Sequence, residues 1–488
     1  MSKDFAETGQ FQTYLSKIGE GLDQFIRFEH QDALAPGKNW RETLSQTLPE
    51  KGIGLDAVTQ QLVDEVIANG SAIVRPGFTS FITTGGTTAS AIASVAGSIG
   101  SPQRYTLNAF NFLEELSLEW LAQMCGVPSM KGIYSTGGSV ANLIALGGAR
   151  QWAFEQVGHD VAALGVDRPT RIYASAECHH TIQRSAGVLG LGRRSVTLIE
   201  CDAQKRMLPE ALAAAIKADL AANILPIAIV ANTGSTNTGA IDPLKEIGEI
   251  AKANRIWFHV DGAYGLPGIL DKRIAHLYDG LELADSVIVD PHKWLGACVG
   301  IAATFIRDRE ILHRAFTQEP ADYLEGSVDY QDGANAPSHS MDDFGIPYFD
   351  FGVELSAPPR GVAVWAMIKE IGVEGMRQRI MRHNDMAQRV AARARAEDRL
   401  ELVLEPSLSI CCFRYIASGI DDLNTFNQRI HRRLVRGNEF IPSTTKVDGI
   451  LAIRPCFVGA RSVPGQDDGL VDEVLRLGDE LLAELGAQ

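Results

Sequence analysis

The sequence predicts an α/β protein built around a mostly parallel sheet with helices on both faces. Between Ile172 and Arg307, short β-rich runs alternate with helical stretches. The runs are continuously apolar, which is typical of strands buried on both faces, and their alternation with helices is typical of parallel βαβ units. Ligands of such sheets bind beyond the carboxyl ends of the strands, so we expect the functional site there.

The predicted elements fall into three parts. Residues 1–84 are helical in pattern, with a Gly/Pro-bearing break at VRPGFTSFITTGGTT, and are expected to form an arm or layer with an apolar face. Residues 85–365 form the large α/β domain, and residues 366–488 form a smaller α+β domain that ends in an amphipathic helix. The expected strands lie in RIYASAE, SVTLIE, PIAIVANTG, IWFHVDGA, SVIVD and GIAATFIR, and then in ELVLE, SICCFRYI and ILAIRP.

The composition indicates a globular protein. The chain of 488 residues is 45% hydrophobic and carries a net charge of −15, which disfavours a nucleic-acid partner. We expect no membrane span and, because the start MSKDFAETGQFQTYLSK lacks a secretory apolar core, a cytoplasmic location. The seven cysteines are scattered without a CxxC pair, so neither a disulfide framework nor a metal site is expected.

Two charged residues stand at the ends of apolar runs. Lys293 follows SVIVD, and a desolvated lysine there loses its proton readily and becomes the amine that Schiff-base chemistry with an aldehyde cofactor needs. The alternative is that Lys293 reaches solvent past the strand end. Asp261 ends IWFHVD, where a carboxylate either pairs with a protonated ring nitrogen or serves as an ordinary cap or turn residue.

Other polar groups follow neighbouring strands. YSTGGSVAN opens a helix at a Gly-Gly turn with Ser139 in its first turn, which suits a phosphate but is also an ordinary helix start. His179 and His180 follow RIYASAE, and Thr236 lies in the hydroxyl-rich loop ANTGSTNTG. Each has an ordinary structural explanation, but all lie at predicted strand carboxyl ends, so we expect them in one crevice.

These motifs resemble the group II pyridoxal-phosphate-dependent amino acid decarboxylases from about Arg75 to the C-terminus. DPHKWL is similar to the family's cofactor-lysine motif. The resemblance implies the type I fold of these enzymes, with a large, mostly parallel seven-stranded sheet, and a cytoplasmic homodimer with shared active sites. It implies pyridoxal 5'-phosphate (PLP) bound to Lys293 as a Schiff base and Asp261 paired with the ring nitrogen.

The resemblance also implies roles for further residues. His179 falls on the family's ring-stacking position, and Tyr323, in FTQEPADYLEGS, falls on the tyrosine that protonates the product. The segment from Thr317 to Pro359 lacks periodicity and is expected to be a lid or binding element. The remaining cofactor contacts implied are Gly138, Ser139, Thr236, Ala263, Asp290 and His292, and Arg360 falls on a recurring arginine.

The expected activity is that of a lyase which converts an L-amino acid to its amine and CO2. Phe81, Thr84 and His179 are the expected substrate contacts, although Ile82 and Thr83 depart from the family pattern. An aromatic substrate is slightly favoured, partly because Trp257 could supply ring surface. The alternatives are glutamate or another acidic amino acid, an aldehyde synthase, and a PLP-binding protein without catalysis.

Overall fold

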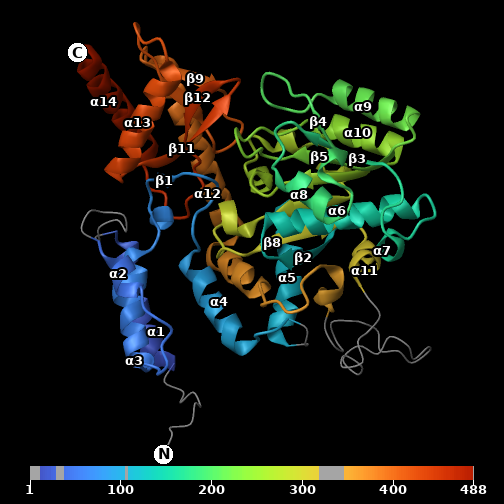
Figure 1. Cartoon of the computed structure of the whole chain (residues 1–488), viewed down its shortest axis with the longest axis horizontal. Coiled ribbons are helices and arrows are strands. Elements are labelled where there is room, and N and C mark those ends of the chain that lie inside the picture. Colours follow the sequence, from blue (N-terminus) through green and yellow to red (C-terminus); the bar gives the residue numbers. More distant parts are fainter. Residues whose placement is uncertain (1–10, 29–37, 105–107, 318–345, 487–488) are drawn as a thin grey trace, which may run out of the picture.

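The computed structural model describes residues 11–28, 38–104, 108–317 and 346–486, and it has the predicted α/β architecture (Figure 1). The large sheet has seven strands in the order β2-β8-β7-β6-β5-β3-β4. Its strands are β2 (Lys131–Ser135), β3 (Thr170–Ser175), β4 (Val196–Ile199), β5 (Leu225–Asn232), β6 (Trp257–Asp261), β7 (Ser286–Val289) and β8 (Ala302–Ile306).

The directions of the strands determine where their carboxyl ends lie. β8 is antiparallel to both of its neighbours, whereas the pairs β7–β6, β6–β5, β5–β3 and β3–β4 are parallel. β2 therefore runs in the same direction as β7. The carboxyl ends of all strands except β8 lie at one edge, and the chain enters β8 from that same edge.

Helices cover both faces of the large sheet, as the apolar runs predict. Side chains alternate between the faces of a strand, so His259 of β6 contacts Asn142 of α6 (Gly138–Glu155), while Phe258 faces Gly248 of α10 (Leu244–Asn254). Figure 1 shows α9 (Pro209–Ala221) beside α10, and α8 (Thr181–Val188) beside α6. α7 (Val161–Leu164) and α11 (Glu310–Phe316) also contact α6. β7 is thereby completely buried.

The C-terminal part forms a second sheet in the order β1-β11-β12-β10-β9. The sequence predicted β9 (Leu400–Leu404), β10 (Cys412–Tyr415) and β12 (Ile450–Arg454) but not β11 (Ile441–Val447), whose sequence IPSTTKV is mostly polar. The sheet packs with α13 (Leu423–Gly437), α14 (Gln466–Gly486) and α12 (Gly361–Ala396). α12 runs across residue 365, where the sequence predicted the boundary between the large and small domains. It is kinked at Gly372, where φ is +64°.

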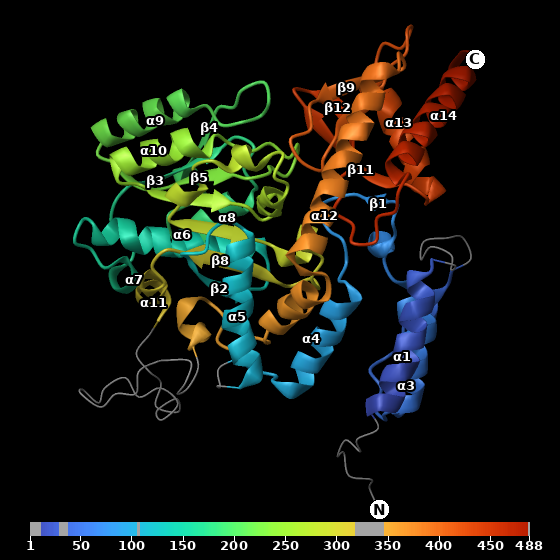
Figure 2. The same ribbon diagram turned by 180° about the vertical axis from the view of Figure 1, so that it is seen from behind.

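The N-terminal part is not purely helical. Its helices α1 (Phe11–Ile26), α2 (Trp40–Leu44) and α3 (Leu55–Gln61) stand to one side of the large sheet in both views (Figures 1 and 2). Beyond them, β1 (Phe78–Thr79) pairs in parallel with β11 and so joins the small sheet. α4 (Thr88–Gly100) and α5 (Ala109–Met124) then pack against α12. In the described part of the chain, no helix is long and apolar enough to cross a membrane.

Candidate active site

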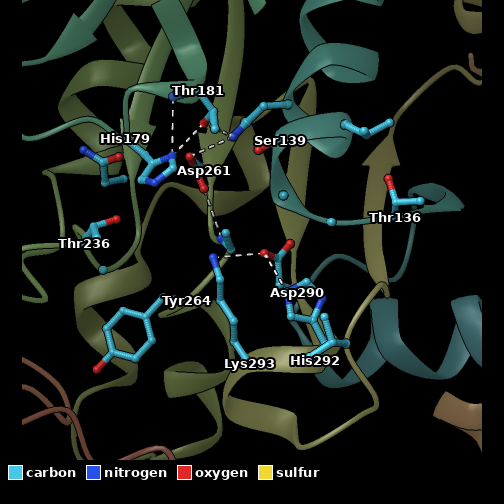
Figure 3. A pocket seen from close by; sticks show the side chains of 18 residues that line it. Thr136, Ser139, His179, Thr181, Thr236, Asp261, Tyr264, Asp290, His292 and Lys293 are labelled. Atoms are coloured by element: carbon cyan, nitrogen blue, oxygen red, sulfur yellow. Dashed lines mark hydrogen bonds and ion pairs between the residues drawn. The ribbon is translucent and has the colours of Figure 1, made fainter. Parts of the chain in front are cut away.

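A cavity of about 370 Å³ opens at the carboxyl edge of the large sheet. Its walls come from the segments that follow β2, β3, β5, β6 and β7, together with Val299 just before β8 (Figure 3). Among its lining residues are most of the predicted ones: Gly138, Ser139, His179, Thr236, Asp261, Ala263, Asp290, His292 and Lys293. The expected convergence on one crevice is thus what the structure shows.

Lys293 lies in a short helical turn, Pro291–Leu295, directly after β7. Its Nζ is 2.9 Å from Asp290 Oδ2, and the Asp290 side chain is 1% exposed. Burial lowers the pKa of Lys293, but the attraction of the Asp290 carboxylate outweighs it, so the pKa of Lys293 lies above its usual value. The sequence-based expectation of a lysine that burial alone deprotonates is therefore wrong for this state, because an adjacent carboxylate stabilises the ammonium form.

The Asp290 carboxylate fills the space between Lys293 and the start of α6. Its Oδ1 is buried and, among the described residues, has no hydrogen-bond partner. Gly138 lies so close that a Cβ there would be 2.7 Å from Asp290 Oδ2. His292 lies on the other side, with Nε2 3.8 Å from Oδ2 and Nδ1 2.6 Å from the carbonyl oxygen of Ile301. Burial lowers the pKa of His292, which leaves the ring neutral.

The start of α6 offers groups that suit an anion. Gly137 precedes the helix, and the amide groups of Val140 and Ala141 already donate to the Gly137 carbonyl oxygen. The amides of Gly138 and Ser139 precede the first intrahelical bond and face the cavity end of the helix, as does the Ser139 hydroxyl. The positive end of the helix dipole adds to the attraction for a phosphate.

Asp261 is held at the end of β6 by two donors. Asn142 Nδ2 donates to Asp261 Oδ2 at 3.0 Å, and the Ala263 amide donates to Asp261 Oδ1 at 3.1 Å. The side chain is only 7% exposed, so the two hydrogen bonds hold the carboxylate in place in a largely dry setting. Sequence reasoning did not single out Asn142, although it lies one turn below Gly138 in the quoted motif TGGSVAN.

His179 faces Asp261 across the cavity (Figure 3). Its Nδ1 is 2.9 Å from the hydroxyl of Thr181, and its ring lies 4.1 Å from the ring of His180. Burial, followed by repulsion from His180, lowers the pKa of His179, so the imidazole is neutral and its apolar ring face is available for packing.

The small domain reaches the cavity through Arg454, which sequence reasoning missed. Its guanidinium donates to the carbonyl oxygens of Thr236 at 2.5 Å, Asn237 at 2.8 Å and Phe81 at 3.3 Å. The side chain is 4% exposed, so it ties the hydroxyl loop, the N-terminal part and β12 together. The one signal in the sequence is an arginine at the end of the predicted strand ILAIRP.

Several predicted residues lie outside the cavity. The Phe81 side chain is 68% exposed, and the hydroxyl of Thr84 accepts from the Ala460 amide at 2.6 Å. Arg360 pairs with Glu354 and donates to the Gly300 carbonyl oxygen, next to the lining residue Val299. Tyr323 and most of the segment from Thr317 to Pro359 lie outside the described residues.

Trp257 requires a correction. It was expected to offer ring surface to an aromatic substrate, but it begins β6 and therefore lies at the opposite edge of the sheet from Asp261. There it packs edge-on against Trp152, with ring centroids 5.8 Å apart. Trp257 and Asp261 are the first and last of the five residues of this extended strand, so Trp257 lies too far from the cavity to touch a ligand there.

Comparisons with known proteins identify the family. The family model described as "Pyridoxal-dependent decarboxylase conserved domain" matches residues 37–416. The chain is 30% identical over 373 residues to the aromatic-L-amino-acid decarboxylase of Bacillus atrophaeus, covering 76% of this chain and 73% of that protein. It is 31% identical over 311 residues to human cysteine sulfinic acid decarboxylase, covering 64% and 60%, respectively.

The fold also matches a solved structure along almost its whole length. The crystal structure of Oryza sativa TDC with PLP and tryptamine superposes with a TM-score of 0.86 at 22% identity, covering 98% of this chain and 99% of that chain.

The cavity residues fit PLP, the cofactor of these enzymes. An aldehyde requires an amine, which Lys293 provides, and a phosphate suits the start of α6, where glycine at 137 and 138 leaves the backbone open. A protonated ring nitrogen requires a buried carboxylate, which Asp261 provides. The chemistry of the cavity lining and that of the cofactor therefore agree at three separate points.

Proposed function

The chain belongs to the pyridoxal-dependent decarboxylase family and is a PLP-dependent carboxy-lyase; from this premise we propose that it decarboxylates an aromatic L-amino acid with Lys293 as the covalent anchor of the cofactor. One observation carries the proposal: the Lys293 amine, the Asp261 carboxylate and the start of α6 line the same cavity. No other lysine is among the described residues that line it.

Each lining group has a role in this proposal. When bound, PLP supplies an electron-accepting ring that stabilises the electron pair left at the α-carbon as CO2 departs. Asp261 holds a proton at the ring nitrogen and thereby keeps the ring electron-poor. The first turn of α6 and Ser139 would hold the phosphate, with His292 and Asp290 nearby, while His179, Ala263 and Thr236 would hold the ring.

Lys293 must lose its proton before its amine can act as a nucleophile. Its ammonium is held by Asp290 at 2.9 Å, so separation of this pair is part of cofactor loading.

Tyr323 is the proposed donor of the proton that completes the amine product. It lies outside the described residues, and the proposal rests on its place in FTQEPADYLEGS. A phenolic donor favours amine formation over oxidative formation of an aldehyde. An amine yield equal to the CO2 yield, without hydrogen peroxide, is the expected result; ammonia and peroxide in step with CO2 would identify an aldehyde synthase.

The aromatic preference rests on apolar surface at the cavity and on the Bacillus relative. Tyr264 and Val299 line the cavity, and Val299 is 73% exposed. Phe81 and Thr84 remain proposed substrate contacts. For Phe81, the support is that Arg454 donates both to the Phe81 carbonyl oxygen and to that of Thr236. The human relative is named a cysteine sulfinic acid decarboxylase, so an acidic amino acid is the second candidate substrate.

We propose that the protein works as a cytoplasmic homodimer. Apolar side chains are exposed on the N-terminal helices, among them Phe11 at 46%, Leu15 at 43% and Leu55 at 53%. A second copy would cover such a surface. The cytoplasmic location is supported by seven free thiols, which persist in a reducing compartment.

The test of the covalent anchor is a Lys293→Ala variant of the full chain. We expect loss of the visible absorbance of the protein-bound Schiff base, together with loss of turnover. Lys131→Ala is the matched control, because Lys131 begins β2 at the opposite edge of the sheet. Full turnover in the Lys293→Ala variant would refute the proposal.

The substrate is tested by measuring CO2 release from all common amino acids with added PLP. Aspartate, diaminobutyrate and cysteine sulfinate belong in the same screen. We expect the highest kcat/KM with an aromatic amino acid, and a higher value with an acidic one would select the second candidate.

A further inference from the structure

A chain of buried hydrogen bonds runs along β6 from Trp257 to Asp261. Trp257 Nε1 lies 2.8 Å from Ser286 Oγ, which lies 2.9 Å from His259 Nδ1. His259 Nε2 lies 2.8 Å from Asn142 Oδ1, and Asn142 Nδ2 lies 3.0 Å from Asp261 Oδ2. All five side chains are at most 7% exposed, so no bulk water competes for these contacts.

The two ends of the chain determine the direction of every bond. An indole N–H can only donate and a carboxylate can only accept. Asp261 accepts from Asn142 Nδ2, so Asn142 Oδ1 faces His259 and accepts from its Nε2–H. In a neutral ring Nδ1 then carries no hydrogen and accepts from the Ser286 hydroxyl, which itself accepts from Trp257.

The neutral state of His259 is consistent with its surroundings. The ring is completely buried, and burial lowers the pKa of His259 to about 4 despite the opposing attraction of Asp261. A neutral ring has one donor and one acceptor, which the chain uses in full.

Asn142 also serves a second branch that reaches the other face of the cavity. Its Nδ2 is 3.3 Å from Thr181 Oγ1, and Thr181 Oγ1 is 2.9 Å from His179 Nδ1. The Thr181 backbone amide donates to His179 Nδ1 at 3.4 Å, so Nδ1 is an acceptor. The Thr181 hydroxyl therefore donates to the same nitrogen, which leaves the His179 proton on Nε2. Figure 3 shows Thr181, His179 and Asp261 grouped together, with Thr181 joined to His179 by a dashed line. A single amide orientation thus serves both groups.

We propose that His259 is a positioning residue that fixes the Asn142 amide and thereby holds the Asp261 carboxylate in its orientation toward the ring nitrogen of the cofactor. This inference rests on the role of Asp261 in the proposed function. If the Asn142 amide turned over, its oxygen would face the Asp261 carboxylate, and the Nε2–H of His259 prevents this. Hydrogen bonds aligned in one direction polarise one another, which strengthens the last donor at Asp261.

The test compares binding of PLP with binding of its 1-deaza analogue, in which a C–H replaces the ring nitrogen. Both are titrated by absorbance into the full chain after its cofactor has been removed. The analogue makes no bond to Asp261, so a defect that acts through this carboxylate weakens PLP alone. We expect His259→Phe to weaken PLP about tenfold, the scale of one hydrogen bond to a charged group, and to leave the analogue nearly unchanged.

Three further variants separate this role from a purely structural one. His259→Gln retains a donor and an acceptor and is expected to restore PLP binding. Ser286→Ala removes one hydroxyl with little change in volume, so it tests the chain of hydrogen bonds even if the His259→Phe variant does not fold. Trp257→Phe removes the terminal donor, and Trp152→Phe is its matched control, because the two rings pack edge-on and only Trp257 belongs to the chain.

The outcomes distinguish this inference from the proposed function. Equal weakening of PLP and the analogue in the His259 and Ser286 variants would overturn the inference and show a structural role only. If Asp261→Asn itself bound PLP as tightly as the unsubstituted chain, the role of Asp261 would fail and the inference with it. Loss of PLP preference in Asp261→Asn but not in the His259 and Ser286 variants would overturn the inference alone.

Discussion

The carboxyl edge of the large sheet and the N-terminal helices differ in which side chains they bury and which they expose. At the sheet edge, charged and polar groups are buried and paired within one chain, as in the contact of Lys293 with Asp290 and that of Asn142 with Asp261. In the N-terminal helices, apolar side chains such as Leu15 and Leu22 are 43% and 42% exposed.

The two regions differ in what their side chains need in order to be stable. Buried charges persist only where partners are arranged precisely, so the sheet edge is organised before any ligand arrives. Exposed apolar surface lowers its free energy only when something covers it. The described residues of one chain therefore bring together the groups that line the cavity, while the apolar surface of the N-terminal helices is the one that the proposed second copy would cover.

Among the variants that retain Lys293, the largest expected effect comes from replacing Asp261. Asp261→Asn removes the carboxylate that holds the ring proton, so we expect kcat to fall about 10²- to 10³-fold, the scale of losing one preorganised electrostatic group. Asp271→Asn is the matched control, because Asp271 is 1% exposed and bonded to Arg273 and Asn384 away from the cavity. Similar losses of kcat per folded molecule in the two variants would mean that Asp261 has no role beyond that of any buried carboxylate.

A smaller effect is expected from crowding at the start of α6. In Gly138→Ala, the added Cβ would lie 2.7 Å from Asp290 Oδ2 and displace a buried carboxylate that contacts Lys293. We expect PLP to bind about tenfold more weakly, the low end of the cost of overpacking. Gly437→Ala is the control, since a Cβ there meets nothing within 4 Å. Unchanged PLP affinity, measured by titration, would show that this edge is not tightly packed.

The smallest effect on the individual chain is expected in the arm. Leu15 and Leu22 are seven residues apart and share one face of α1, so Leu15→Glu/Leu22→Glu places two charges on the exposed apolar surface. We expect sedimentation to show a shift from dimer to monomer. Leu198→Glu, on β4 and 47% exposed, should leave the dimer intact. Dimer retention in the double variant would exclude this face as the interface.

Much of the large domain could be predicted from sequence because its signals are local. The apolar runs SVIVD and PIAIVANTG are continuous, so they indicated buried parallel strands, and β5 to β7 are where they were expected. IPSTTKV carries no such pattern, and β11 forms because its backbone pairs with β12 on one side and β1 on the other. Backbone pairing of this kind leaves little trace in side-chain hydrophobicity.

The candidate site shows the same division. Lys293 and Asp261 were predicted because a charged residue at the end of a buried strand is conspicuous, and both line the cavity. Asn142 and Arg454 were missed because each is recognised only by partners distant in the sequence, Asp261 and Thr236, respectively. Trp257 was misjudged because residue type says nothing about which end of a strand faces the ligand.

The sequence by itself determined the type of fold, the family, and the strand-end residues that converge on the cavity, because these follow from local pattern and from the shared direction of parallel strands. The tertiary structure decided the charge and orientation of those residues. Lys293 is an ammonium because Asp290 lies 2.9 Å away, and Asp261 receives two donors because α6 brings Asn142 beside β6. Electrostatic and hydrogen-bond energies depend on distances of a few ångströms, and only the packed chain sets those distances.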